Sequence, residues 1–196
     1  MDKPYPIIII SGPSGAGEDS IIEKLGERIA TERVITTSTR AMRPGESEGH
    51  PYHFISKQDF EDKVKEGKFF EYAQEYNGQL YGVTFEELKR VEESGKIGVW
   101  KIEYKGVIKA KEMIPNIVAI FINAPLDVLK SRIKRRDNVD DAYIAERMKY
   151  TEEWLKYRHI YDYEVENVEG KLDESVAKTE SIVRDLFPLD KNGKIL

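Results

Sequence analysis

Residues 7–22 read Ile-Ile-Ile-Ile-Ser-Gly-Pro-Ser-Gly-Ala-Gly-Glu-Asp-Ser-Ile-Ile, and this stretch decides the fold. The four consecutive isoleucines predict a strand that is buried on both faces, as in the centre of a parallel sheet. A glycine-rich turn follows, and then Ile21, Ile22, Leu25 and Ile29 recur at the spacing of one helical stripe. A strand, a glycine-rich turn and a helix in this order predict a loop whose unhindered amides bind a phosphate at the helix N-terminus.

The charged positions of this loop depart from the usual pattern, which is G-x-x-x-x-G-K-[ST]. The glycine frame fits from Gly12 to Gly17, but Glu18 stands at the lysine position and Asp19 at the Ser/Thr position. The predicted phosphate loop consists of Gly12, Pro13, Ser14, Gly15, Ala16, Gly17, Glu18, Asp19 and Ser20. It has the shape of a phosphate cradle with altered charges.

The composition narrows the class of protein. The 196 residues include no cysteine and carry a formal net charge of −5, which excludes disulfides and thiol chemistry and disfavours a broad nucleic-acid interface. The chain shows no long apolar run and no N-terminal signal, so we expect a cytoplasmic protein that does not bind a membrane. The three histidines lack the spacing of a metal site, and we expect a single domain in a monomer or homodimer.

Further apolar runs alternate with helical patterns along the chain. Predicted strands at 97–104, 117–122 and 162–168 are separated by predicted helices, which indicates an α/β fold with a parallel sheet flanked by helices on both faces. The segment 36–85 differs, because short strand patterns and an Asn77-Gly78 turn dominate it. Within and beside it the predicted strands are 34–39, 52–55, 69–73 and 80–84. This segment predicts a small mixed or antiparallel lobe inserted in the α/β body.

Several separate motifs resemble the guanylate kinase family, from about Pro6 to Phe187. Residues 36–46, Thr-Thr-Ser-Thr-Arg-Ala-Met-Arg-Pro-Gly-Glu, are similar to the family's S-x-T-T-R-x-x-R-x-G-E segment, which grips GMP. Tyr52 and Tyr81 fall at its two phosphate-binding tyrosines, and Glu71 falls at the glutamate that reads guanine. The arginines of the family's lid region are matched by Arg132, Arg136 and Arg147.

The resemblance implies a P-loop kinase core at about 5–35, 84–130 and 158–187, a GMP-binding lobe at about 36–83 and a helical lid at about 131–157. It implies phosphoryl transfer from Mg-ATP to GMP or dGMP. The implied GMP-binding residues are Thr36, Arg40, Arg43, Glu46, Tyr52, Glu71, Tyr81 and Glu103. The implied catalytic residues are Arg40, Arg132, Arg136 and Arg147, and Arg136 and Asn167 fall near the adenine. To these we add Lys101, not from the resemblance but as a candidate substitute for the missing loop lysine.

The residue types suit this chemistry. Arg40, Arg43, Tyr52 and Tyr81 can donate forked and hydroxyl hydrogen bonds to a phosphate monoester. Carboxylates such as Glu46 and Glu71 can accept from guanine N1–H and its amino group, which adenine does not offer in that arrangement. Lid arginines would neutralise the transferred phosphoryl group and hold donor and acceptor in line.

Two further positions also depart from the family. Lys101 replaces the first acid of its D/E-x-D motif, whereas Glu103 keeps the second, and Val83 replaces a serine that contacts guanine. Two unit charges about 4 Å apart interact by roughly 4 kcal/mol at an effective dielectric constant near 20, so Glu18 threatens ATP binding. We therefore expect Lys101 to pair with Glu18 or to reach the phosphates itself.

Three alternatives remain open from the sequence. Glu18 and Asp19 could bind Mg²⁺ together with phosphate oxygens. They could instead occupy the anion site themselves, because acids are favoured at a helix N-terminus. The chain would then be a catalytically dead module that binds GMP or a phosphopeptide, as scaffold-protein domains of this kind do. The third alternative is an active kinase for another acceptor or donor.

Overall fold

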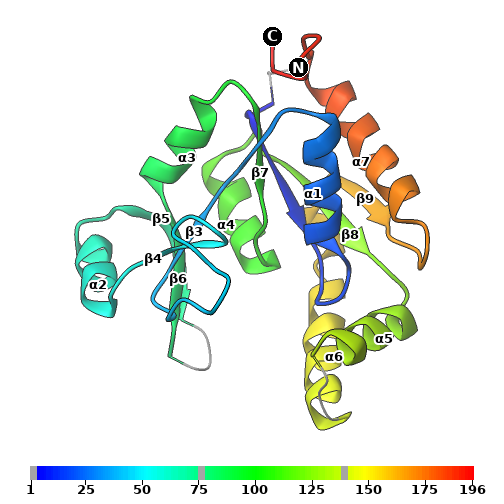
Figure 1. Ribbon diagram of the computed structural model, residues 1–196, viewed down its shortest axis with the longest axis horizontal. Helices are drawn as coiled ribbons and strands as arrows, with labels where there is room; N and C mark the ends of the chain where they lie inside the picture. The colour runs from blue at the N-terminus through cyan, green and yellow to red at the C-terminus, as the bar shows by residue number, and fades with distance from the viewer. Residues whose placement is uncertain (1–3, 75–77, 138–140) are drawn as a thin grey trace.

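The computed structural model describes residues 4–74, 78–137 and 141–196, without the side chains of residues 136, 137 and 141. Five strands form one fully parallel sheet in the order β2-β7-β1-β8-β9 (Figure 1). These strands are β1 (Ile7–Ser11), β2 (Thr31–Arg33), β7 (Ile97–Trp100), β8 (Val118–Asn123) and β9 (Tyr163–Glu166). The predicted parallel sheet, with β1 at its centre, is confirmed.

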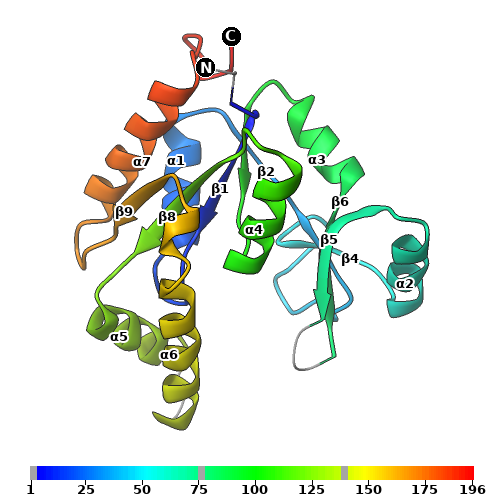
Figure 2. The ribbon, with the colours of Figure 1, turned by 180° about the vertical axis from the view of Figure 1, so that it is seen from behind.

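The four isoleucines of β1 are fully buried because both faces of the sheet are covered by helices (Figure 2). Ile8 and Ile10 pack in one cluster with α1 (Glu18–Arg28) and α7 (Leu172–Leu186). Ile7 and Ile9 pack in the other cluster with α3 (Phe85–Glu92) and α4 (Tyr104–Met113). Each fully buried isoleucine contributes roughly 1.5–3 kcal/mol, so this strand anchors both layers.

A second, smaller sheet has the order β4-β3-β6-β5 and is mixed, because β3 pairs parallel with β4 and antiparallel with β6. Its strands are β3 (Thr36–Ser38), β4 (Tyr52–Phe54), β5 (Phe69–Gln74) and β6 (Leu80–Thr84), and α2 (Lys57–Lys65) lies beside them. We call this sheet with α2 and its loops the small lobe. The predicted turn at Asn77-Gly78 falls partly outside the described residues.

The strand predicted at 34–39 is confirmed only at β3 (Thr36–Ser38), and the separate strand before it was not predicted. The chain forms β2 in the large sheet and β3 in the small lobe, with Val34 and Ile35 between them. The amide of Val34 donates to Val99 O at 2.9 Å and that of Ile35 to Glu87 Oε1 at 2.7 Å. Both acceptors are far away in the sequence, so local β propensity could not locate this crossing between sheets.

Two helices, α5 (Leu126–Asp137) and α6 (Asp141–Leu155), pack together and lie apart from the small lobe (Figures 1 and 2). A short 3₁₀ turn, η1 (Arg158–Ile160), then leads into β9. The part of the predicted lid at residues 138–140 lies outside the described residues. Within the described ranges, no helix is both long and apolar enough to cross a membrane.

Candidate active site

The loop between β1 and α1 has the geometry of a phosphate cradle. Gly15 and Gly17 have φ angles of 87° and 91°, in the region that favours glycine, and Ala16 N donates to Pro13 O at 2.9 Å. A Cβ on Gly12 would lie 2.3 Å from the carbonyl oxygen of Ile122, so the first glycine is needed for close approach to β8. The structure thus brings the predicted loop residues together at the start of α1.

Glu18 is the first residue of α1, and its side chain turns inward, with the residue only 9% exposed. Burial raises the pKa of its carboxyl to about 7, against the opposing effects of Lys101 and of the backbone N–H groups of Glu18 and Gly17. Among the residues that the structure describes, Glu18 forms no ion pair. Its carboxyl therefore lies at the start of α1, where the backbone N–H groups of Gly17 and Glu18 act on it.

Lys101 does not pair with Glu18 as we expected from the sequence. Its Nζ bonds to Asp19 Oδ2 at 2.5 Å, and Asp19 Oδ1 also accepts from Arg33 Nη2 at 2.5 Å. These two cations lower the pKa of Asp19 although partial burial opposes them. The three side chains carry one net positive charge at the mouth of the loop. Arg33 escaped the sequence analysis because it ends β2, whose place beside β7 is a long-range property.

Asn167 and Arg132 hold the phosphate loop from behind. The buried Asn167 donates from Nδ2 to Ala16 O at 2.7 Å. Arg132 donates from Nη1 to Gly15 O at 3.2 Å and from Nη2 to Asn167 O at 3.1 Å, and its Nε bonds to Glu169 at 3.0 Å. A cavity of about 190 Å³ lies here, lined by Gly17, Ser20, Arg132, Asn167, Val168, Gly170 and Leu172. Arg132 is therefore bound to the loop itself.

The other predicted lid arginines lie on the α5–α6 pair. Arg147 on α6 donates from Nε to the hydroxyl of Tyr143 at 3.1 Å and stacks over that ring. Arg136 belongs to α5, and its side chain is outside the described part of the chain. Arg135, which the sequence analysis passed over, joins Arg132 on Glu169 with an Nη2–Oε1 distance of 2.7 Å.

In the small lobe, the Arg40 side chain is fixed in place by the carboxylate of Glu46. Its two terminal nitrogens donate to both oxygens of Glu46 at 3.0 and 2.8 Å, and the backbone N–H of Arg43 donates to the same carboxylate at 2.7 Å. The guanidinium also lies 5.2 Å from the ring centre of Tyr52. The Glu46 carboxylate is thus occupied by Arg40, and it holds Arg40 in place instead of facing a base.

The two predicted phosphate tyrosines converge on this arginine. Tyr52 and Tyr81 meet edge to face with ring centres 5.7 Å apart, because β4 and β6 lie on either side of β3. Thr36, paired with Tyr52 across the β3–β4 ladder, lies at the same edge. The ionisable tyrosine hydroxyls also raise the pKa of Arg40, after the larger effect of Glu46.

Two carboxylates from different parts of the fold act electrostatically on one another. Burial raises the pKa of Glu71 on β5, Lys109 on α4 opposes this shift, and Glu103 adds to it. Glu103 caps the start of α4 and accepts from the hydroxyl of Tyr150 on α6 at 2.6 Å. Val83, at the position of the family's serine, is fully buried, so it offers no hydroxyl to a ligand.

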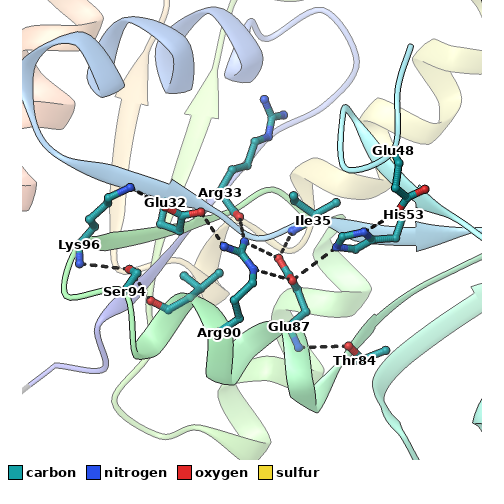
Figure 3. A network of polar contacts seen from close by, with 11 residues as sticks. Glu32, Arg33, Ile35, Glu48, His53, Thr84, Glu87, Arg90, Ser94 and Lys96 are labelled. Carbon is teal, nitrogen blue, oxygen red and sulfur yellow. Dashed lines mark hydrogen bonds and ion pairs between the residues drawn. The ribbon is translucent and has the colours of Figure 1, made fainter.

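A polar network fixes the small lobe to the core where β2 leads into β3 (Figure 3). The buried Glu87 on α3 accepts from Ile35 N and from Arg90 Nε, at 2.7 and 2.9 Å. His53 on β4 lies 3.6 Å from the same carboxylate and 2.7 Å from Glu48. The His53 ring thus bridges the small lobe and α3.

A chain of buried hydrogen bonds joins α6 to the end of β1. Trp154 Nε1 donates to the hydroxyl of Tyr161 at 2.9 Å, and that hydroxyl lies 2.9 Å from Ser11 Oγ. Ser11 Oγ donates its only proton to Ile102 O at 2.7 Å. Tyr161 must therefore donate to Ser11, which fixes the direction of the whole chain. Nothing in the local sequence pattern indicated these contacts.

The parallel sheet, the cradle before α1 and the two flanking substructures define a P-loop kinase. The description "Guanylate kinase" belongs to the family model that matches residues 4–186. The chain belongs to the guanylate kinase family and is thereby a nucleoside monophosphate kinase, a transferase.

Named relatives and solved structures agree with this membership. The chain is 34% identical over 183 residues to the guanylate kinase of Bdellovibrio bacteriovorus, covering 92% of this chain and 97% of that protein. It is 35% identical to the guanylate kinase of Alcanivorax borkumensis over 82% and 78% of the two chains. The guanylate kinase structure from Anaplasma phagocytophilum superposes with a TM-score of 0.68 at 25% identity, covering 94% and 88%. A shikimate kinase from Acinetobacter baumannii shares the fold, with a TM-score of 0.50 at 17% identity over 93% and 94%.

Proposed function

We propose that this chain transfers a phosphoryl group from Mg-ATP to GMP or dGMP, giving GDP or dGDP, through its altered phosphate loop. The observation that carries the proposal is the preorganised Arg40, bound by both oxygens of Glu46 and lying over Tyr52. A clamped guanidinium beside two tyrosine hydroxyls suits a phosphate monoester. The relatives named guanylate kinase support GMP as that monoester.

Acceptor binding is divided between the small lobe and α4. Arg40, Arg43, Tyr52 and Tyr81 would bind the GMP phosphate, with Thr36 beside them. Glu71 and Glu103 would accept hydrogen bonds from the guanine edge. Glu71 lies on β5, Glu103 is the N-cap of α4, and the two carboxylates act electrostatically on one another. Glu46 would act indirectly, through its hold on Arg40.

The donor phosphates would lie on the amides of Gly12–Ser20, with Lys101 in place of the missing loop lysine. Asp19 is bound by Arg33 as well as by Lys101, so the group of three keeps one net positive charge beside the loop. An ammonium has three N–H donors, and one of them suffices for Asp19. This arrangement lets Lys101 contact a phosphate while it stays bonded to Asp19.

The residues at this site also fit a magnesium ion that arrives with the nucleotide. Asp19 stands at the position of the usual hydroxyl ligand, its side chain is 60% exposed, and carboxylate with phosphate oxygen is a donor set that Mg²⁺ accepts. When bound, the ion would neutralise charge on the donor phosphates. Arg136 and Arg147 would neutralise the transferred phosphoryl group, while Arg132 and Asn167 would hold the loop and border the adenine.

One observation favours a second candidate, a non-catalytic module that binds GMP or a phosphopeptide. Glu18 lies against the amides that a donor phosphate would need, and a carboxylate there mimics the missing anion. A module of this kind would keep the Arg40 site and lose turnover. Cytoplasmic location and a monomer or homodimer stay predictions in either case.

The deciding experiment measures ADP formation with GMP, ATP and Mg²⁺, and a reaction without GMP as the blank. The Lys101→Ala variant is compared with Lys178→Ala, which removes an exposed lysine from α7. We expect GMP-dependent turnover that falls about a hundredfold in kcat/KM for ATP in Lys101→Ala only, since a contact of roughly 3 kcal/mol is lost. GMP affinity, measured by calorimetry, should stay unchanged.

Three results would contradict parts of this proposal. Unchanged ATP use in Lys101→Ala would remove the role of Lys101 but leave the kinase. No turnover together with GMP binding would establish the non-catalytic module. A chain that shows no turnover and binds neither GMP nor a phosphopeptide would overturn both candidates.

A further inference from the structure

The helix that carries Arg147 also touches Glu103, the proposed guanine-facing carboxylate. Tyr150 lies three residues after Arg147 on α6, and its hydroxyl donates to Glu103 Oε2 at 2.6 Å. This is the length of a charge-assisted bond between a hydroxyl and a carboxylate. The two residues are 47 positions apart in the sequence, so the contact depends on the tertiary fold.

The ring of Tyr150 is fixed before any ligand binds. Its centre lies 6.1 Å from that of Tyr104, which directly follows Glu103, and 5.9 Å from that of Trp154 on the next turn of α6. Tyr104 is itself stacked on Tyr157 at 4.5 Å. Because both neighbours are buried, the Tyr150 hydroxyl is held at one place above the start of α4.

The hydrogen-bond inventory of Glu103 leaves one oxygen for a ligand. Oε2 accepts from Tyr150, and within the described ranges Oε1 accepts no hydrogen bond. Burial and the Glu103 carboxylate raise the pKa of Tyr150, so the hydroxyl keeps its proton and stays a donor. The Tyr150 hydroxyl therefore fixes one oxygen of this carboxylate, and the carboxylate acts electrostatically on Glu71 of β5.

We propose that Tyr150 is a positioning residue that orients Glu103 toward the acceptor base and thereby couples base recognition to the helix carrying Arg147. This inference rests on the proposed function, because it takes Glu103 as a ligand of the guanine base. It assigns to α6 a second task beside the presentation of Arg147. A base seated on Glu103 would then favour the observed position of α6, and that position would in turn favour base binding.

The test uses calorimetry with GMP on the full chain, comparing Tyr150→Phe with Tyr157→Phe. Both variants delete one hydroxyl from the same aromatic cluster, but no hydrogen bond of the Tyr157 hydroxyl is seen among the described residues. We expect Tyr150→Phe to weaken GMP binding about fivefold, as befits the loss of one oriented hydrogen bond. Tyr157→Phe should bind GMP as the unmodified chain does.

A double-mutant cycle with Glu103→Gln separates positioning from a general structural effect. If Tyr150 acts through Glu103, adding Tyr150→Phe to Glu103→Gln should change GMP affinity by less than about twofold. In turnover, Tyr150→Phe should raise KM for GMP, leave KM for ATP unchanged and reduce the preference for GMP over AMP.

Each other outcome decides against the proposal. Tighter GMP binding in Tyr150→Phe would show that the hydroxyl competes with the base for Glu103. Unchanged binding, or equal losses in both tyrosine variants, would show that the hydroxyl has only a packing role. In those cases the unmodified chain still binds GMP, so the proposed function survives. If the unmodified chain fails to bind GMP, the function fails and this inference fails with it.

Discussion

Removing the charge of Glu18 should stabilise the protein at alkaline pH. The carboxyl has a pKa of about 7 in the folded chain against 4.5 for an ordinary glutamate, chiefly because it is buried. The unfolded chain therefore releases this proton first as the pH rises. From about pH 4.5 upward folding is increasingly opposed, and the penalty is complete above about pH 7.

The size of the penalty follows from the same pair of values. The difference between 4.5 and about 7 corresponds to about 3 kcal/mol of unfolding free energy, since one pKa unit is worth 1.36 kcal/mol. Glu18→Gln keeps the shape of the side chain and cannot ionise. At pH 8 we expect it to be about 2–3 kcal/mol more stable, which raises Tm by about 6–10 °C in a chain of this length. At pH 4 the two proteins should be equally stable.

Urea unfolding at pH 4, 5, 6, 7 and 8 measures this directly, with Glu23→Gln on the exposed face of α1 as the matched control. The reasoning is refuted if Glu18→Gln and the unmodified chain show parallel stability curves between pH 4 and pH 8. It is equally refuted if Glu23→Gln gains as much stability as Glu18→Gln, because the effect would then follow from removing any negative charge from α1 and not from the burial of Glu18.

Two further predictions concern the fixed points of the fold. Glu87→Gln keeps one oxygen for the Ile35 amide but turns an NH₂ group toward Arg90 Nε, so urea unfolding should show a loss of about 2 kcal/mol, against almost none for the exposed Glu86→Gln. Equal losses would contradict the network. Gly17→Ala places a Cβ 2.4 Å from Asn167 Nδ2 at a φ of 91°, whereas Gly45→Ala has a similar φ and no atom within 4 Å. Gly17→Ala should therefore cost at least 1 kcal/mol more than Gly45→Ala in urea unfolding, roughly the value of a displaced hydrogen bond, and equal costs would show that backbone strain alone matters.

The parts of the fold that were predictable are those set by strong local patterns. The isoleucine run could only be a strand buried on both faces, and the glycine spacing left one loop geometry before α1. The split between β2 and β3 was not predictable, because it depends on the buried Glu87, which is distant in sequence and accepts the Ile35 amide.

In the candidate site, too, some features could be predicted from the sequence and others depend on contacts in the folded chain. Matching motifs identified Arg40, Tyr52 and Tyr81, which the structure brings together. The expected pairing of Lys101 with Glu18 was wrong, since Glu18 turns inward at the first residue of α1 and the more exposed Asp19 meets the ammonium. Contact of Lys101 with the phosphates stays a prediction. The sequence shows that two acids of the loop need a nearby cation. The direction of each side chain at the start of the helix decides which of the two acids forms the ion pair.

In the proposed function, the segment Lys101–Glu103 links the altered loop to the rest of the site. Each of its three residues is bonded to a different part of the molecule: Lys101 to Asp19 in the loop, Ile102 O to Ser11 at the end of β1, and Glu103 to Tyr150 on α6. Moving the cation from the loop to this segment places it two residues from the proposed base-reading carboxylate. Donor charge, acceptor recognition and the position of α6 then depend on one short stretch of backbone, so a shift of that stretch at any one bond must alter the other two.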